Sequence, residues 1–241
     1  MLMMSFQPAA HGAFRSPAFP CALEGASPPD RELFCHGFQM SEETERSQRH
    51  TERMARKKAV VDAAIARASE QRGVFLVLTG NGKGKSSSAF GMVARALGHG
   101  MAVSVFQFIK GKGDTGEQTF FQRQPNLRWE QCGEGFTWET QSRERDIAAA
   151  RAGWDKAHAA LSDPAVHLVV LDEMTYLFKY GYLPLEEVLS ALASRPAHQH
   201  VVVTGRAAPE ALCAAADTVS EIADIKHAFR AGIMAQPGID L

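Results

Sequence analysis

The chain of 241 residues is expected to fold as an α/β protein, with a mostly parallel sheet, helices on both faces and a helix before it. Two observations predict this class. After residue 72, short apolar runs alternate with helical segments, which is the order found in parallel sheets. The apolar runs are also continuous, as in strands that are buried on both faces. With 45% hydrophobic and 22% charged residues, the chain has enough apolar material for a buried core.

The first 72 residues divide into two segments. Residues 1–40 are rich in Pro, Gly, Ser and Ala without a helical or strand period, which indicates a disordered tail or a mis-called N-terminal extension before Met40. Residues 41–72 hold strong helix formers and neither Gly nor Pro, which predicts a helix. This helix is polar on most sides, so it is either simply solvated or an arm that docks on a partner subunit or over a site.

Residues 73–241 form the α/β domain. The expected strands are the apolar runs, and they cover 74–78, 102–109, 167–173 and 200–206, with short candidates at 127–131 and 218–222. The expected helices contain strong helix formers, and they cover 86–97, 142–161, 183–195 and 208–216. Gly-rich or polar loops are expected at 110–118 and 132–141. This order predicts one sheet whose ligands bind at the carboxyl ends of the strands.

Bulk composition excludes several classes of function. The net charge of −1 argues against a general nucleic-acid binder. The four cysteines show no metal-ligand spacing, which favours reduced structural thiols. The chain has no apolar run of about 18 residues and no signal-peptide core, so we expect a cytoplasmic protein without membrane spans.

The segment "TGNGKGKSSSAFG" (79–91) predicts a phosphate-binding loop between a strand and a helix. Only three residues (Asn81, Gly82 and Lys83) separate Gly80 from Gly84, where the usual pattern has four. Glycines let backbone N–H groups face an anion, and the following helix directs its positive end at it. Lys85 adds a charge beside the phosphates. Ser86 offers a hydroxyl to Mg²⁺.

The run "HLVVLDE" ends in two acids at the same edge of the sheet. A carboxylate at the end of a buried strand can hold Mg²⁺ directly or through water. We favour Glu173 as the direct ligand and Asp172 as an indirect or alternative one. A pair of this kind also suits a metal ligand plus a general base for ATP hydrolysis.

Three further features are candidates for ligand binding. Phe136 and Trp138 in "GFTW" lie outside any apolar period, so they either cap the core or line a pocket for a large flat ligand. Arg206 follows a strand and Gly205, where it either reaches phosphate or forms a surface ion pair. The Lys226-His227 pair is a weaker candidate, for which packing or surface exposure is the simpler interpretation.

Many segments in one order carry a resemblance to a known family. They are "TGNGKGKSSSAFG", "VFQFIKG", "GFTWETQ", "VVLDEMTY", "YLPLEEVLSAL", "RPAHQHVVVTGR", "ADTVSE", "KHAF" and "AQPGID". Because of these segments, the chain from about residue 41 onward resembles the P-loop type of corrinoid adenosyltransferase. The resemblance implies a three-layer, RecA-like P-loop NTPase fold. The family usually has Thr at the position of Ser86, which keeps the hydroxyl.

The resemblance also implies the chemistry. A corrinoid reduced to Co(I) attacks the 5′-carbon of ATP, and tripolyphosphate leaves. The implied substrates are ATP and a reduced corrinoid, with Mg²⁺, or Mn²⁺ as an alternative, as the cofactor. Phe136 and Trp138 correspond to aromatic residues that crowd the lower face of the corrin ring. A homodimer with the N-terminal helix over the partner's site, and a reduced flavoprotein as electron donor, are further implications.

Two other functions stay open at this stage. One is a P-loop ATPase or kinase that uses Glu173 as base. The other is a nucleotide-dependent module that binds a corrinoid without chemistry. The shortened loop and "GFTW" favour the transferase, because neither has a role in a plain ATPase.

Overall fold

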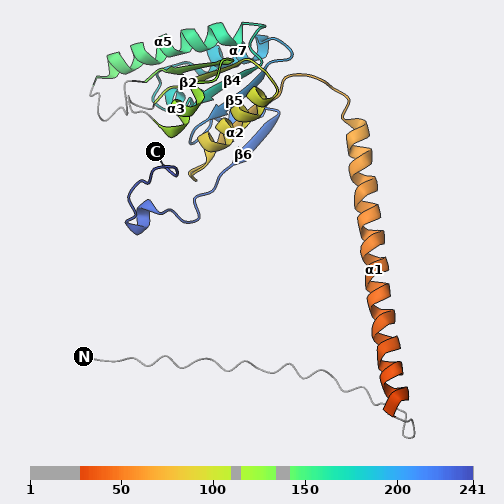
Figure 1. Ribbon diagram of the computed structural model, residues 1–241. Helices are drawn as coiled ribbons and strands as arrows, with labels where there is room; N and C mark the ends of the chain where they lie inside the picture. Colours follow the sequence, from red (N-terminus) through yellow and green to blue (C-terminus); the bar gives the residue numbers. More distant parts are fainter. Residues whose placement is uncertain (1–27, 110–114, 134–141, 241) are drawn as a thin grey trace, which may run out of the picture. The chain divides into compact units, whose positions relative to one another are not determined.

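The computed structural model describes residues 28–109, 115–133 and 142–240, in a unit up to Ser69 and a larger unit from Glu70 onward (Figure 1). The first unit holds helix α1, Pro28–Arg67. This helix begins earlier than the predicted residue 41, since Pro is tolerated in a first turn and helix formers follow it. None of the described helices combines the length and apolarity needed to cross a lipid bilayer.

A six-stranded sheet forms the centre of the larger unit, and all of its strand pairs are parallel. The strands are β1 (Phe75–Thr79), β2 (Val103–Gln107), β3 (Leu127–Gln131), β4 (Leu168–Asp172), β5 (His200–Thr204) and β6 (Thr218–Glu221). Their spatial order is β3-β2-β4-β5-β1-β6. The predicted strands are therefore all present, including both short candidates.

Helices cover both faces of the sheet (Figure 1). They are α2 (Lys85–Gly98), α3 (Gly116–Phe121), α5 (Arg143–Leu161), α6 (Thr175–Lys179), α7 (Leu185–Ser194) and α8 (Glu210–Ala215), with a 3-10 turn at Phe229–Ala231. Successive residues of β4 enter different cores: Val169 packs under α5 and α7, and Val170 packs under α2. The continuous apolar run of β4 follows from this, because both of its faces are buried. The predicted three-layer α/β fold is confirmed.

Two short helices were not predicted. Helix α3 occupies part of the expected 110–118 loop, and Thr115 caps it by accepting a hydrogen bond from the Gln118 backbone N–H. The spacing of Thr115 and Gln118 is that of a capping box, which was a readable signal. Helix α6 has only five residues, too few for an apolar period to show.

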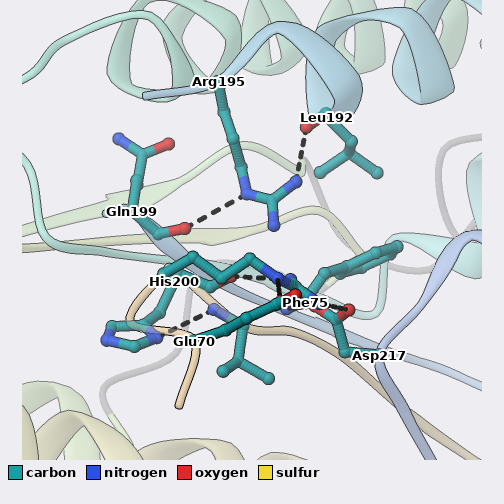
Figure 2. Close-up of polar contacts among 10 residues, drawn as sticks. Glu70, Phe75, Leu192, Arg195, Gln199, His200 and Asp217 are labelled. Carbon is teal, nitrogen blue, oxygen red and sulfur yellow. Dashed lines mark hydrogen bonds and ion pairs between the residues drawn. The ribbon is translucent and has the colours of Figure 1, made fainter. Parts of the chain in front are cut away.

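Polar contacts connect the segments at the amino ends of the strands. Figure 2 shows the Arg195 guanidinium directed at the main-chain oxygens of Leu192 and Gln199, at 2.6 and 3.1 Å. Asp217 accepts hydrogen bonds from the Phe75 N–H at 2.8 Å and from two nitrogens of Arg72 at 2.8 and 2.6 Å. These contacts hold the chain extended before β1. Helix α1 ends at Arg67, before the predicted residue 72.

Candidate functional site

The parallel register brings polar side chains together at the carboxyl edge of the sheet. Gln107 lies opposite Asp172, and Leu171 lies opposite Val203, so Asp172 is beside Thr204. Gln107, Asp172 and Thr204 are all completely buried. Buried polar groups are tolerated only when they are hydrogen-bonded, so this edge is a built polar site and not a solvated strand end.

The loop after β1 packs closely against the strand end of β6. The Gly82 N–H donates to the Ile222 oxygen at 2.7 Å, and the Ile222 N–H donates to the Thr79 oxygen at 2.8 Å. A Cβ on Gly80 or Gly82 would lie 2.5 or 2.4 Å from main-chain oxygens of Ile222 or Ala223. Gly80 also has a φ of +98°, which disfavours any other residue. Two of the loop glycines are thus required by packing.

The start of α2 faces open space. Gly84 is the N-cap residue, with a φ of +120° and no side chain to satisfy the first N–H groups of the helix. A Cβ there would meet no atom within 4 Å. An uncapped helix start that lines a pocket is suited to binding an anion, because N–H groups and the helix dipole point the same way.

Lys85 is the buried cation of this loop. Its side chain is only 6% exposed, and its Nζ donates to the Gly82 oxygen at 2.7 Å. Burial lowers the pKa of Lys85, the neighbouring Arg206 lowers it further, and the carboxylates of Glu173 and Asp172 oppose this by favouring the charged form. Lysine, arginine and two carboxylates therefore share one electrostatic site.

A cavity of about 280 Å³ lies at this edge. Its walls combine the phosphate loop, the strand ends and the C-terminal segment, and the lining residues are Gly82, Lys83, Gly84, Lys85, Ser86, Ser87, Ile109, Glu117, Glu173, Tyr176, Arg206, His227, Ile239 and Asp240. The structure thus brings together Lys83, Lys85, Ser86, Glu173 and Arg206 as the sequence predicted. Two predicted loop residues, Gly80 and Asn81, are not part of the cavity lining.

The two acids after β4 have different surroundings. Asp172 accepts hydrogen bonds from Gln107 Nε2 at 3.0 Å and from the Thr204 hydroxyl at 2.7 Å, deep in the sheet. Glu173 lines the cavity and has a left-handed φ of +57°. Glu173 is therefore the acid that faces the ligand space, and Asp172 lies behind it.

The donors around the cavity fit a magnesium ion that is shared with phosphate. Mg²⁺ in nucleotide sites usually takes one or two protein ligands plus phosphate oxygens and keeps several waters. Glu173 and Ser86 line the same cavity and supply a carboxylate and a hydroxyl. Within the described ranges, His, Cys, Asp and Glu form no cluster of three or more that would hold a metal by itself.

Some cavity residues were missed or undervalued from the sequence. Tyr176 comes from the unpredicted helix α6, and burial together with the Glu173 charge raises the pKa of its hydroxyl. His227 lines the cavity, although packing or surface exposure was the simpler interpretation. Asp240 forms an ion pair with Lys83 at 2.6 Å. The pairing of β6 with β1 places this C-terminal segment beside the loop. The sequence offered the Lys226-His227 pair there as a weak candidate and gave no signal for Asp240.

Part of the predicted site is not described. Phe136 and Trp138 lie outside the described residues, as do residues 110–114 of the Gly-rich loop. The remainder of that loop enters α3, whose Glu117 lines the cavity. The predicted aromatic pocket is therefore still a prediction.

Comparison with known proteins identifies the family of this arrangement. The family model described as "ATP:corrinoid adenosyltransferase BtuR/CobO/CobP" matches residues 71–241, which include every residue of the cavity. The chain belongs to this family. A second family model, described as "Cob(I)alamin adenosyltransferase N terminal", matches residues 40–65 within α1.

Curated proteins of the same family are similar over most of their length. A corrinoid adenosyltransferase of Pseudomonas aeruginosa is 61% identical over 202 residues, covering 83% of this chain and 100% of that protein. The corrinoid adenosyltransferase CobA of Salmonella typhimurium is 50% identical over 193 residues, or 80% and 98% of the two chains. A corrinoid adenosyltransferase of Sinorhizobium sp. is 43% identical over 195 residues, or 80% and 91%. The chain is accordingly an enzyme of the corrinoid adenosyltransferase type.

Proposed function

We propose that the chain transfers the 5′-deoxyadenosyl group of ATP to Co(I) of a corrinoid and releases tripolyphosphate. The acceptor is cob(I)alamin, cobinamide or cobyrinic acid a,c-diamide. The observation that carries the proposal is the convergence of Lys85, Ser86, Glu173 and Arg206 on one cavity beside a shortened phosphate loop, in a member of this family. The electron pair of Co(I) forms the Co–C bond, and the C5′–O bond breaks with its pair leaving on tripolyphosphate.

The loop's part in this reaction is to hold the departing phosphates. All three phosphates leave together, so the site need not stabilise a transferring γ-phosphoryl group as a kinase does. The buried Lys85 ammonium and the uncapped start of α2 direct positive charge at the leaving group. Arg206, which lines the same cavity, adds a second cation. The remaining contribution is to fix C5′ in line with cobalt, which is a positioning effect.

Magnesium fits beside these cations. When bound, it would neutralise part of the charge that grows on the departing tripolyphosphate. Ser86 and Glu173 are the residues that would hold it, and Mn²⁺ would fit the same oxygen ligands. Asp172 anchors the strand end behind them through Gln107 and Thr204.

The corrinoid side of the site is assigned by resemblance. Phe136 and Trp138 would crowd the lower face of the ring and help to expel the axial ligand, which makes the cobalt easier to reduce. The N-terminal helix would reach over the partner's site in a homodimer, and a reduced flavoprotein would supply the electron. We place the reaction in the cytoplasm, where ATP and reduced flavoproteins are available.

An anaerobic assay with ATP, Mg²⁺ and chemically reduced cobalamin tests the proposal. The expected product is a light-sensitive alkylcobalamin chromophore. ADP and phosphate without that chromophore would support a P-loop ATPase that uses Glu173 as base. Tight binding of both ligands with no product would indicate a module that only binds the corrinoid.

A paired substitution separates the two halves of the site. Phe136→Ala with Trp138→Ala should slow reduction of the bound Co(II) corrinoid while ATP affinity stays near that of the wild type. Lys85→Ala should abolish adenosyl transfer but leave the reduction of the bound Co(II) corrinoid intact. A collapse of ATP affinity in the aromatic variant would mean that those rings belong to the core instead.

A further inference from the structure

The Thr204 hydroxyl connects the two acids that follow β4. It donates to Asp172 Oδ1 at 2.7 Å and accepts a hydrogen bond from the Glu173 N–H at 2.9 Å. The direction of both bonds is determined, because a carboxylate oxygen accepts and an amide N–H donates. The side chain is completely buried, so water cannot replace either bond.

The Glu173 backbone needs this support. Its φ of +57° is unfavourable for a residue with a side chain, at a cost on the order of 1–3 kcal/mol. Two residues in the loop that follows β5, Gly205 and Ala207, also have positive φ, and a Cβ on Gly205 would lie 2.0 Å from the Thr175 hydroxyl. Strained backbone is therefore concentrated where β4 and β5 end at the cavity, as it often is at functional sites.

A chain of hydrogen bonds orients Thr204 from behind. Gln107 Nε2 donates to Asp172 Oδ2 at 3.0 Å, and Gln107 Oε1 accepts from Trp129 Nε1 at 3.2 Å. Because indole N–H can only donate, the Gln107 amide can only point its nitrogen at Asp172. Asp172 is thus held on both oxygens, and the Thr204 hydroxyl donates its hydrogen to one of them.

From these contacts we infer that Thr204 is a positioning residue: its hydroxyl holds the left-handed turn that presents Glu173 to the phosphate cavity. The inference rests on the proposed function, since it assigns Glu173 to the metal of that site. Loss of the hydroxyl lets the Glu173 backbone relax toward ordinary φ values, which moves the carboxylate away from the cavity. Residues that orient metal ligands in this indirect way typically change metal affinity by about 10–100-fold when replaced.

The test compares ATP binding with and without Mg²⁺ by calorimetry on the full chain, which requires no corrinoid. Thr204→Val keeps the side-chain shape and removes the hydroxyl. We expect it to reduce the gain in ATP affinity that Mg²⁺ provides by about tenfold or more, with metal-free ATP affinity unchanged. Thr204→Ser keeps the hydroxyl and should retain that gain. Gln107→Met removes one donor to Asp172 and should give a smaller loss in the same direction.

Gln199→Leu is the matched control, at a buried polar residue just before the same strand. Gln199 precedes β5, is completely buried, and its Nε2 donates to the main-chain oxygens of Ala160, Asp163 and Val166 at the opposite edge. The control should lower the melting temperature without changing the effect of Mg²⁺ on ATP binding.

Three results would overturn the inference. They are an unchanged Mg²⁺ effect in Thr204→Val, the same loss in Gln199→Leu, or a tenfold loss in Thr204→Ser. If Thr204→Val does not fold, Thr204→Ser and Gln107→Met still decide the question. Failure of the wild type to make an alkylcorrinoid while the Mg²⁺ pattern holds would contradict the proposed reaction and leave the role of Thr204 intact.

Discussion

Replacement of Lys85 by methionine should separate the rate of the reaction from the stability of the fold. Methionine preserves the length and most of the apolar stem but removes the ammonium group that donates to the Gly82 oxygen at 2.7 Å. Loss of one preorganised group that stabilises developing charge lowers kcat by about 10²–10³-fold, or about 2.7–4 kcal/mol. We expect a loss in this range, because Lys85 is only 6% exposed and solvent screens it little.

The free energy of unfolding should change far less. Burial lowers the pKa of Lys85, so the folded state already holds the charge at a cost in desolvation. Removing that cost offsets the lost hydrogen bond and the lost attraction to Glu173 and Asp172, which leaves stability within about 1 kcal/mol of the wild type.

The assay is initial-rate formation of the alkylcorrinoid at saturating ATP, together with thermal unfolding of the same samples. Lys83→Met is the matched control in the same loop. The Lys83 side chain is 45% exposed and pairs with Asp240, so its removal should cost less than about tenfold in rate. Equal losses in both variants, or a large loss of stability in Lys85→Met, would refute the assignment of Lys85 to the leaving group.

Three further changes have definite expected outcomes. Asp240→Asn should raise ATP affinity severalfold at low salt, because it releases Lys83 from its ion pair beside the cavity. Titrations at two salt concentrations should show that this gain shrinks as salt rises. Weaker ATP binding in the variant would contradict this expectation. Gly82→Ala should abolish ATP binding, since its Cβ would lie 2.4 Å from a main-chain oxygen. Its control is Gly91→Ala, at an exposed helical position with open space around it. This control should stabilise the fold by about 0.5–1 kcal/mol in denaturant titrations. Asp217→Asn should lower stability at neutral pH by about 1 kcal/mol, or about 2–4 °C in melting temperature. Its partner Arg72 and the Phe75 N–H depress the pKa of Asp217 from 3.8 to about 2. The stabilisation is therefore complete above about pH 4 and is lost as pH falls through 2, so the two proteins should converge near pH 1. A difference in stability that persists at pH 1 would contradict this role of the ion pair.

The sheet was predictable because its signal is local. Each central strand is a short apolar run, and burial on both faces of β4 and β5 requires such runs. The phosphate loop was equally readable, since a Gly-rich turn follows a strand and leads into Lys85 and Ser86 at the start of a helix, although the turn is one residue shorter than usual. The carboxyl edge of a parallel sheet then brought Glu173 and Arg206 to the same place without knowledge of strand order.

What the sequence could not reveal depends on contacts between distant segments. The C-terminal segment reaches the phosphate loop because β6 pairs with β1, which places the weakly predicted His227 and the unpredicted Asp240 on the cavity wall. The sequence favoured Glu173 over Asp172 as the direct ligand, but it did not show the left-handed φ of Glu173 or the Thr204 hydrogen bonds that separate the two acids. In the structure Asp172 is completely buried, whereas Glu173 lines the cavity.

The point of bond cleavage in ATP tests the central claim most directly. Phosphorus NMR of an anaerobic reaction with Mg²⁺ and chemically reduced cobalamin distinguishes the phosphate products. The account predicts tripolyphosphate in amounts equal to the alkylcobalamin formed, with no ADP, and loss of both products in Lys85→Met. Release of ADP and phosphate in place of tripolyphosphate would contradict it.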